Sequence, residues 1–188
     1  MDARVRYSQL SIKTALIKLL KNDVLDDISV TDICKEAKVN RATFYKYFKS
    51  PCDVLSKVED DHIAEIKRKL DYADANGLRD VFDVAVKYIQ SDADFFSVVV
   101  SGHGNTQFRS KIIDACKPYN IDIIKEKFPE ITETQREFLY HFLAEGIIGM
   151  ILSYEHETEH KYSLDDYVMF TLDFIDKFNS IGSKYYNK

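Results

Sequence analysis

The sequence predicts an all-α fold, and composition and hydrophobic spacing are the main reasons. The chain has 188 residues, 45% of them hydrophobic, but only six glycines and three prolines. Scarcity of glycine and proline favours long helices over the many turns of a sheet protein. Apolar residues recur at helical spacing, as in the run from Leu78 to Gln90. The clearest break in the chain is the segment SGHGNT.

The stretch from Ile28 to Phe48, ISVTDICKEAKVNRATFYKYF, predicts two short helices around a tight turn. Thr31 is expected to cap the first helix, and Asn40 is a good N-cap for the second. Phe44 and Phe48 are four residues apart, so both fall on one face of the second helix and can pack inward. The remaining arc carries Arg41, Ala42, Thr43, Tyr45, Lys46 and Tyr47. Such a capped pair is a helix-turn-helix, which lays its second helix in the DNA major groove.

The exposed arc of the second helix has the chemistry of a DNA-reading surface. It offers a guanidinium to guanine, a methyl group to thymine, and hydroxyls and an ammonium to phosphates. The alternative is a small amphipathic helix with a solvated polar face, but tyrosines are an unusual way to build one. Charge agrees with DNA contact at this end of the chain: residues 1–50 hold 10 basic and 6 acidic residues, whereas residues 51–188 hold 16 basic and 25 acidic.

The run from Ile12 to Leu55, SIKTALIKLL followed by ISVTDICKEAKVNRATFYKYFKSPCDVL, resembles the DNA-binding domain of the tetracycline-repressor (TetR) family of bacterial regulators. The segment NRATFYKYF is its most specific part. The resemblance implies a three-helix domain in which a first helix supports the helix-turn-helix from behind. By position, it implies that Arg41, Ala42, Thr43 and Tyr47 face bases or phosphates. It also implies that Thr31, Tyr45 and Lys46 fix the register on the DNA backbone.

Two positions depart from that family's pattern. Lys38 stands in the turn where the family usually has glycine, and a left-handed backbone there costs about 1 kcal/mol. Pro51 stands where the family tends to place a lysine, at the start of the fourth helix. Proline is a good first helical residue but not a cation, so fewer phosphate contacts would weaken binding and reduce its salt dependence.

Residues 51–188 are expected to form a second, helical domain for ligand binding and dimerisation, after a helix-turn-helix domain of residues 1–50. The helices predicted in this domain are Pro51 to Asp74, Leu78 to Gln90, DADFFSVVV, Thr106 to Phe128, Thr134 to Tyr154 and Leu164 to Ser180. The fourth of these should be interrupted or kinked at Pro118.

The helix expected over Thr134–Tyr154 is apolar nearly all round, so it must be buried on more than one side. One side can face its own core and the other a second subunit, giving a four-helix bundle with the last helix and its symmetry copies. Gly146 and Gly149 would allow close approach; the alternative is that they are merely small packing residues. The expected interface consists of Phe138, Phe142, Gly146, Gly149, Phe170, Phe174 and Phe178.

This half, through DFF, FRSKI and YHFLAEGIIGMIL, resembles the C-terminal domain of TetR-family regulators of the dihydroxyacetone-kinase-regulator type. A tryptophan expected after the glycine pair is Tyr154 here, and the chain has no tryptophan. The resemblance implies a homodimer whose recognition helices meet successive major grooves, about 34–36 Å apart. It also implies an inducer pocket between the middle helices.

Candidate pocket residues are Phe95, Phe96, His103, Phe108, Tyr119, Tyr140 and His141. No arginine cluster marks a phosphate or carboxylate site, so an apolar or weakly polar ligand is expected. The alternative is that these are ordinary core aromatics and surface histidines, with no small molecule bound at all.

Other classes of protein are disfavoured by missing signals. No apolar run approaches the roughly 18 residues that cross a bilayer, and the N-terminus lacks the apolar core of a signal peptide. Cys34, Cys52 and Cys116 are unclustered, which suits a reducing cytoplasm. The H-E-x-x-H string from His156 to His160 lies in a polar connection, where zinc-protease chemistry would lack a rigid helix. We expect no catalytic residue, metal site or cofactor.

The sequence therefore predicts a cytoplasmic transcriptional regulator that binds a palindromic double-stranded DNA operator as a homodimer, with a possible small apolar effector. Repression is the more frequent role in the family it resembles. The alternative is a co-regulator or protein-interaction module that keeps the fold but has little DNA affinity of its own.

Overall fold

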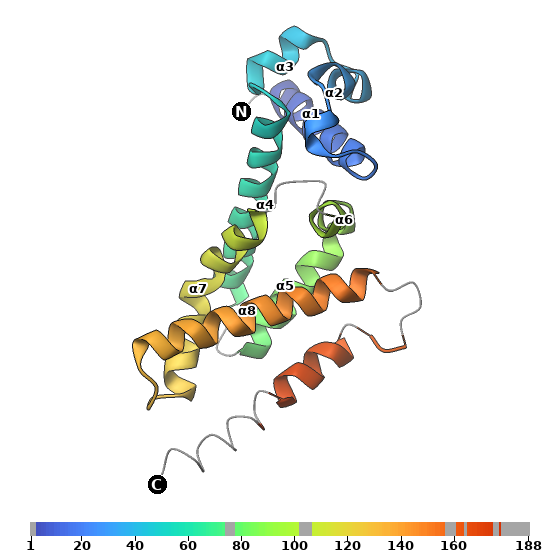
Figure 1. Cartoon of the computed structure of the whole chain (residues 1–188). Helices are drawn as coiled ribbons and strands as arrows, with labels where there is room; N and C mark the ends of the chain where they lie inside the picture. Colours follow the sequence, from blue (N-terminus) through green and yellow to red (C-terminus); the bar gives the residue numbers. More distant parts are fainter. Residues whose placement is uncertain are drawn as a thin grey trace. The chain divides into compact units, whose positions relative to one another are not determined.

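A computed structural model describes residues 3–73, 78–101, 107–156, 161–163, 165–174 and 177. The helices are α1 Ala3–Leu20, α2 Val30–Ala37, α3 Arg41–Tyr47, α4 Pro51–Ala73, α5 Leu78–Ser91, α6 Ala93–Ser101, α7 Phe108–Lys127 and α8 Glu133–His156, with a short 3-10 turn η1 at Leu25–Asp27 (Figure 1). Residues 165–174 are also helical. No strand occurs in the described ranges, so the all-α prediction is confirmed.

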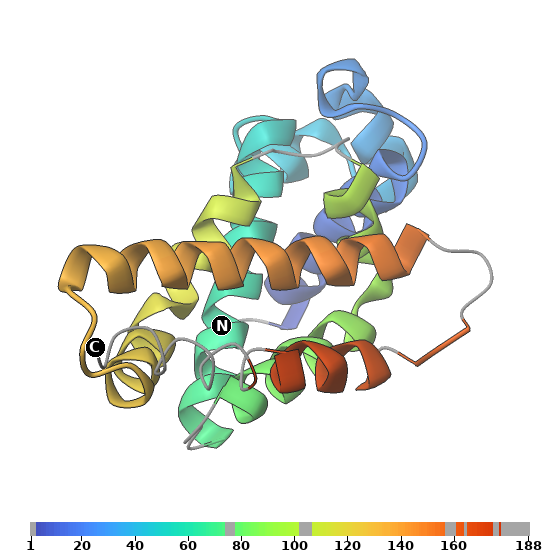
Figure 2. The same cartoon turned by 60° about the horizontal axis from the view of Figure 1, so that its bottom comes forward.

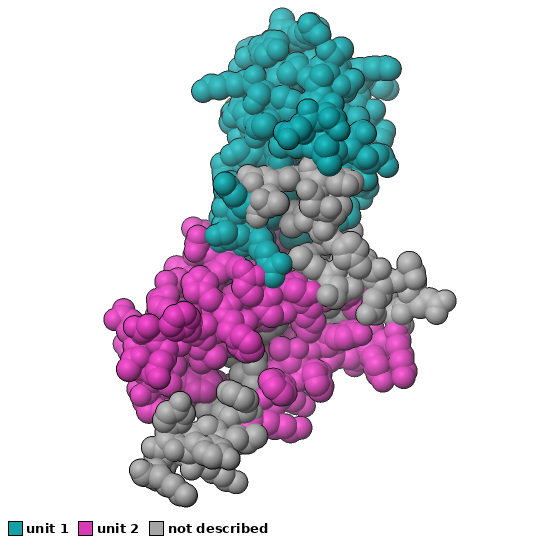
Figure 3. Space-filling model, in the orientation of Figure 1, with its two compact units in different colours: residues 1–65, 91–112 teal, residues 66–90, 113–188 magenta. Residues whose placement is uncertain are grey.

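The chain folds as two compact units that do not follow chain order (Figure 3). The first contains residues 1–65 and 91–112, and the second contains residues 66–90 and 113–188. The division expected at residue 50 falls inside the first unit, because Val54 and Leu55 of α4 and Val98 of α6 join one core with α1–α3.

The first unit is held by a continuous apolar core. On α1, Ile12, Leu16 and Leu20 are four residues apart, so all three lie on one face and are fully buried. Ile33 of α2 and Phe44 of α3 complete the same core. The helix-turn-helix is thus packed against α1, as the three-helix resemblance implied.

The second unit contains two smaller apolar clusters. In one, Ile113 and Ile124 of α7 pack with Tyr140 of α8, whose hydroxyl donates to the Ile113 carbonyl. In the other, Val168 packs with Val86 and Met150. The helical residues 165–174 run antiparallel beside α8 in both views of the ribbon (Figures 1 and 2).

The sequence predicted an interruption or a kink at Pro118, and no interruption occurs, because α7 continues as one helix from Phe108 to Lys127. A proline leaves the carbonyl four residues earlier without its N–H partner. That residue is Asp114, which is exposed like Pro118, so water can satisfy the carbonyl.

The first unit also buries a carboxylate, that of Glu59 on α4, whose side chain is only 1% exposed. Lys111 Nζ lies 2.7 Å from Glu59 Oε2. Burial raises the pKa of Glu59, and the lysine partly opposes that rise. Because the folded-state pKa is raised, protonation of Glu59 favours the folded state, and this contribution is present at low pH and lost as pH rises.

We expect Lys111→Met to lower the free energy of unfolding by about 2 kcal/mol at pH 7.5, because a buried carboxylate loses its partner. The deficit should shrink towards pH 5 as Glu59 takes up a proton. Urea denaturation followed by circular dichroism at both pH values measures this. Lys117→Met is the matched control, since Lys117 and its partner Glu137 are both half-exposed. An equal deficit at both pH values would contradict the prediction.

Candidate nucleic-acid interface

The first helix of the motif, α2, is capped by Ser29 and not by Thr31, so that prediction was wrong. Ser29 Oγ accepts from the Asp32 backbone N–H at 3.3 Å, and the Asp32 carboxylate accepts from the Ser29 N–H at 3.0 Å. This reciprocal pair is a capping box. The bonds from Ser29 hold the pKa of Asp32 below its usual value. Thr31 therefore lies within the first turn, with its side chain exposed.

The turn between α2 and α3 depends on Lys38, which has φ 55° and ψ 40°. This is the left-handed conformation expected from its position, and for a lysine it carries strain of about 1 kcal/mol. The backbone N–H of Val39 donates to the Cys34 carbonyl at 3.0 Å, which closes the end of α2. Val39 then packs against the core and fixes the direction in which the chain enters α3.

The recognition helix α3 has a sharp division between a buried and an exposed face. Asn40 Oδ1 accepts from the Thr43 N–H at 2.7 Å, which confirms the predicted cap. Phe44 and Phe48 are buried, as predicted, with ring centroids 6.0 Å apart. The rest of the expected arc is available on the other side: Arg41, Ala42, Tyr45 and Lys46 are exposed, and Thr43 and Tyr47 are half-buried.

Two contacts set the arrangement of the charged groups on α3. Arg41 Nη2 donates to Thr31 Oγ1 at 2.5 Å, which joins the first turns of α2 and α3. Lys46 Nζ lies 5.4 Å from the centre of the Tyr47 ring. The exposed face thus presents two cations and the Tyr45 phenol ring, whereas Tyr47 packs partly against the core.

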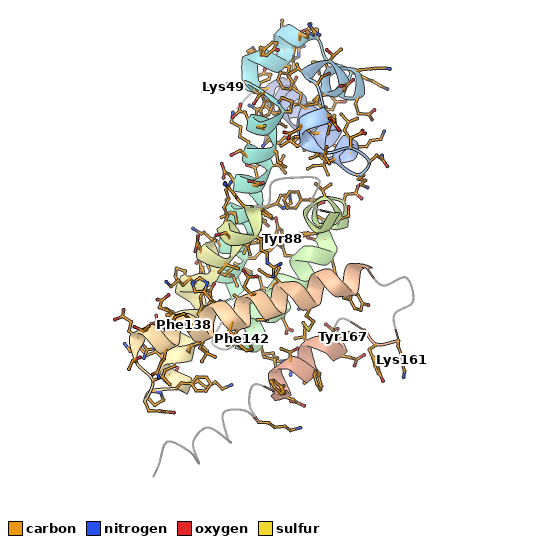
Figure 4. The ribbon with its side chains drawn as sticks, viewed as in Figure 1. Lys49, Tyr88, Phe138, Phe142, Lys161 and Tyr167 are labelled. Atoms are coloured by element: carbon orange, nitrogen blue, oxygen red, sulfur yellow. The ribbon has the colours of Figure 1, made fainter. Side chains whose placement is uncertain are left out.

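The end of α3 is fixed by α4, through a residue that sequence reasoning missed. Lys57 Nζ donates to the Tyr47 carbonyl at 3.1 Å and lies 5.0 Å from the centre of the Phe48 ring. At the start of α4, the Asp53 carboxylate accepts from the Lys49 backbone N–H at 2.8 Å, which lowers the pKa of Asp53. Lys49 marks this junction in Figure 4. The i, i+4 spacing of Asp53 and Lys57 was visible in the sequence.

Three of the expected pocket residues, Phe95, Phe96 and Phe108, are buried together in the first unit. The Phe95 ring centre lies 5.3 Å from that of Phe96 and 5.0 Å from that of Phe108. His62, which sequence reasoning did not single out, stacks on Phe95 with ring centres 3.6 Å apart. Burial of His62 lowers its pKa.

The other expected pocket residues lie elsewhere. Tyr119, in the second unit, donates to Asp71 at 2.7 Å, and this bond raises its pKa to about 12. Burial raises the pKa of Tyr140. His141 is exposed, and His103 lies outside the described residues.

Four of the aromatic residues expected at a dimer interface are exposed in the second unit. Phe138 and Phe142 are each 72% exposed on α8 (Figure 4), and Phe170 and Phe174 are exposed on the helical segment that follows. A Cβ added at Gly146 or Gly149 would meet nothing within 4 Å. Phe178 lies outside the described residues. The core of the unit is built from other residues of α8, including Leu143 and Ile147.

The described residues lack the features of a metal site and of a membrane-spanning helix. They contain no group of three or more His, Cys, Asp or Glu side chains placed to hold a metal ion. None of the described helices has the length and hydrophobicity that crossing a bilayer demands. His156 is the last residue of α8, and residues 157–160 of the H-E-x-x-H string lie outside the described part.

Comparison with known proteins agrees with this architecture. Residues 76–177 match the family model TetR_C_8, described as a transcriptional regulator C-terminal region. The chain is 28% identical over 92 residues to the HTH-type dhaKLM operon transcriptional activator DhaS of Lactococcus lactis subsp. lactis (strain IL1403). That match covers 49% of this chain and 48% of DhaS, so the chain spans about half the length of this curated relative.

Two solved structures share the fold at low sequence identity. A TetR transcriptional regulator from Streptococcus agalactiae 2603V superposes with a TM-score of 0.72 at 19% identity, covering 93% of this chain and 96% of that one. A structure of the dihydroxyacetone kinase operon activator DhaS gives a TM-score of 0.56 at 20% identity, covering 79% and 84%. The family match spans more than half of the chain, and the proteins it resembles are regulators and not enzymes. The chain belongs to the TetR family of transcriptional regulators.

Proposed function

We propose that this protein is a sequence-specific DNA-binding regulator that recognises a palindromic operator as a homodimer, reading it through α3. The observation that carries the proposal is the division of α3 into two faces. Phe44 and Phe48 anchor the helix in the core, so Arg41, Tyr45 and Lys46 are held outward on a rigid element. Guanidinium, phenol and ammonium groups on a helix of this size match the edges and phosphates of a major groove.

The homodimer is supported by the exposed face of the second unit, defined by Phe138, Phe142, Phe170 and Phe174. Two helical segments of this unit each carry a pair of exposed phenylalanines, and burying such large apolar side chains against a second copy would remove them from water. The neighbouring glycines give a partner helix room for close approach. A two-fold axis through this face would create a four-helix bundle and present two copies of α3 to two half-sites.

An apolar small-molecule effector is part of the proposal on the strength of the family resemblance alone, since Phe95, Phe96, Phe108 and His62 pack directly against one another. Whether the protein represses or activates transcription is a separate question. Repression is the prediction from the family resemblance, whereas the curated relative DhaS is named as an activator. A reporter placed behind the selected operator, with and without this protein, distinguishes the two roles.

Selection of binding sites from random duplex DNA, sequenced at two salt concentrations, tests DNA recognition. An enriched inverted repeat is expected, with affinity that falls as salt rises. Absence of any enriched sequence would favour the interaction-module alternative, and recovery of bound protein partners would then be the next measurement.

We expect Lys46→Ala to weaken binding to every DNA sequence alike and to reduce the slope of log affinity against log salt by about two. The reason is that each lysine on a phosphate contributes about one to the slope, and the dimer carries two copies. Fluorescence anisotropy across a salt series measures the slope. Lys161→Ala, which removes another exposed lysine from the second unit (Figure 4), should leave it unchanged. A sequence-dependent loss in Lys46→Ala would contradict this role.

A further inference from the structure

A hydrogen bond between Arg41 and Thr31 joins the first turns of α3 and α2. Arg41 Nη2 and Thr31 Oγ1 are 2.5 Å apart, although the two residues belong to different helices and both are exposed. An exposed arginine normally samples many rotamers, and ordering it upon binding costs conformational entropy. The hydrogen bond to Thr31 favours one direction of the Arg41 guanidinium and so lowers that cost.

Thr31 can serve as this acceptor because it has no capping role. Ser29 and Asp32 together satisfy the start of α2, so the Thr31 hydroxyl is not committed to the backbone. A neutral hydroxyl also orients the guanidinium without neutralising its charge, as a carboxylate would. The bond engages one terminal nitrogen of Arg41, and the guanidinium carries further N–H donors that can face a base.

We propose that Thr31 is a positioning residue: its hydroxyl holds Arg41 in the rotamer that reads guanine, and so sets sequence preference at a base pair that Thr31 does not touch. This inference rests on the proposed DNA-reading function. It differs from the role that the family resemblance implied for Thr31, a contact with the DNA backbone. A backbone contact supports all sequences equally, whereas a positioning residue supports only those with the guanine.

The test compares full-length Thr31→Val, Thr31→Ser and Arg41→Ala on the selected operator and on a copy in which the guanine read by Arg41 is replaced. That guanine is the one whose replacement Arg41→Ala tolerates. Thr31→Val keeps the side-chain shape but removes the acceptor. We expect it to lose about 5- to 25-fold in affinity for the selected operator, from one hydrogen bond in each of two subunits, and little for the replaced one. Thr31→Ser should restore the preference.

The double variant Thr31→Val with Arg41→Ala isolates the coupling between the two side chains. If Thr31 acts through Arg41, the valine should have no further effect once the arginine is absent. Urea denaturation should show that all variants are as stable as the parent protein, because both side chains are exposed.

Two results would overturn the inference while leaving the proposed function intact. One is an equal loss on both operators in Thr31→Val, which would mark a phosphate contact. The other is a full valine effect in the Arg41→Ala background. A parent protein that prefers no sequence would instead overturn the proposed function, and this inference with it.

Discussion

Phe44→Ala is expected to lower the free energy of unfolding by about 3–5 kcal/mol, the cost of emptying a fully enclosed aromatic site. The Phe44 side chain is 0% exposed and belongs to the core that joins α1, α2, α3 and α4. Its ring also lies against Phe48. Since domains have only about 5–15 kcal/mol of stability, a loss of this size would leave the first unit marginally folded.

The matched control is Tyr45→Ala, at the adjacent position. The Tyr45 side chain is 59% exposed and is in edge contact with Phe44 at 5.5 Å between ring centres. Its removal should change stability by no more than about 0.5 kcal/mol, but should weaken DNA binding. Urea denaturation and anisotropy on the same samples separate the two effects. A Phe44→Ala protein as stable as Tyr45→Ala would show that the core does not depend on this ring.

Local patterns in the sequence predicted most features of the helix-turn-helix. The four-residue spacing of Phe44 and Phe48 and the cap at Asn40 are both determined within a few residues, so they could be identified without a fold. The error at Thr31 came from overlooking a local signal: Ser29 has Asp32 three residues later, which is the capping-box spacing. Thr31 has Cys34 at that distance, which cannot close the box.

Contacts between helices distant in sequence could not be predicted in the same way. Lys57 reaches the Tyr47 carbonyl, and His62 stacks on Phe95, only because α4 lies beside α3 at one end and beside α6 further along. The pairing of Glu59 with Lys111 spans 52 positions and depends on α4 meeting α7. None of these contacts produces a periodic residue pattern in the sequence, because each depends on how whole helices pack together.

Phe142→Lys is expected to convert the proposed homodimer to a folded monomer at micromolar concentration. Phe142 lies on the exposed face of α8 with 72% of its side chain accessible, so its removal costs the subunit's own core little. In a symmetric interface the change occurs twice. Each copy loses about 2 kcal/mol of apolar burial and adds an ammonium that must be desolvated. Sedimentation equilibrium measures the dissociation constant, and helical circular dichroism checks the fold.

Tyr72→Lys is the matched control, because Tyr72 is 88% exposed and lies on α4, a helix that carries none of the four phenylalanines of the proposed interface. It adds the same charge in place of another exposed aromatic ring and should leave the dimer intact. A Phe142→Lys protein with the parent's dissociation constant would show that this face is not the interface.

The affinity of the Phe142→Lys monomer for DNA then distinguishes base recognition by α3 from dimerisation. Each monomer keeps α3 with its anchored core face, so affinity for a single half-site should equal that of the parent. Affinity for the full palindrome should fall sharply, because the second half-site is no longer bound intramolecularly at high effective concentration. If the half-site affinity fell as well, the second unit would be influencing the recognition helix through the fold and not through dimerisation alone.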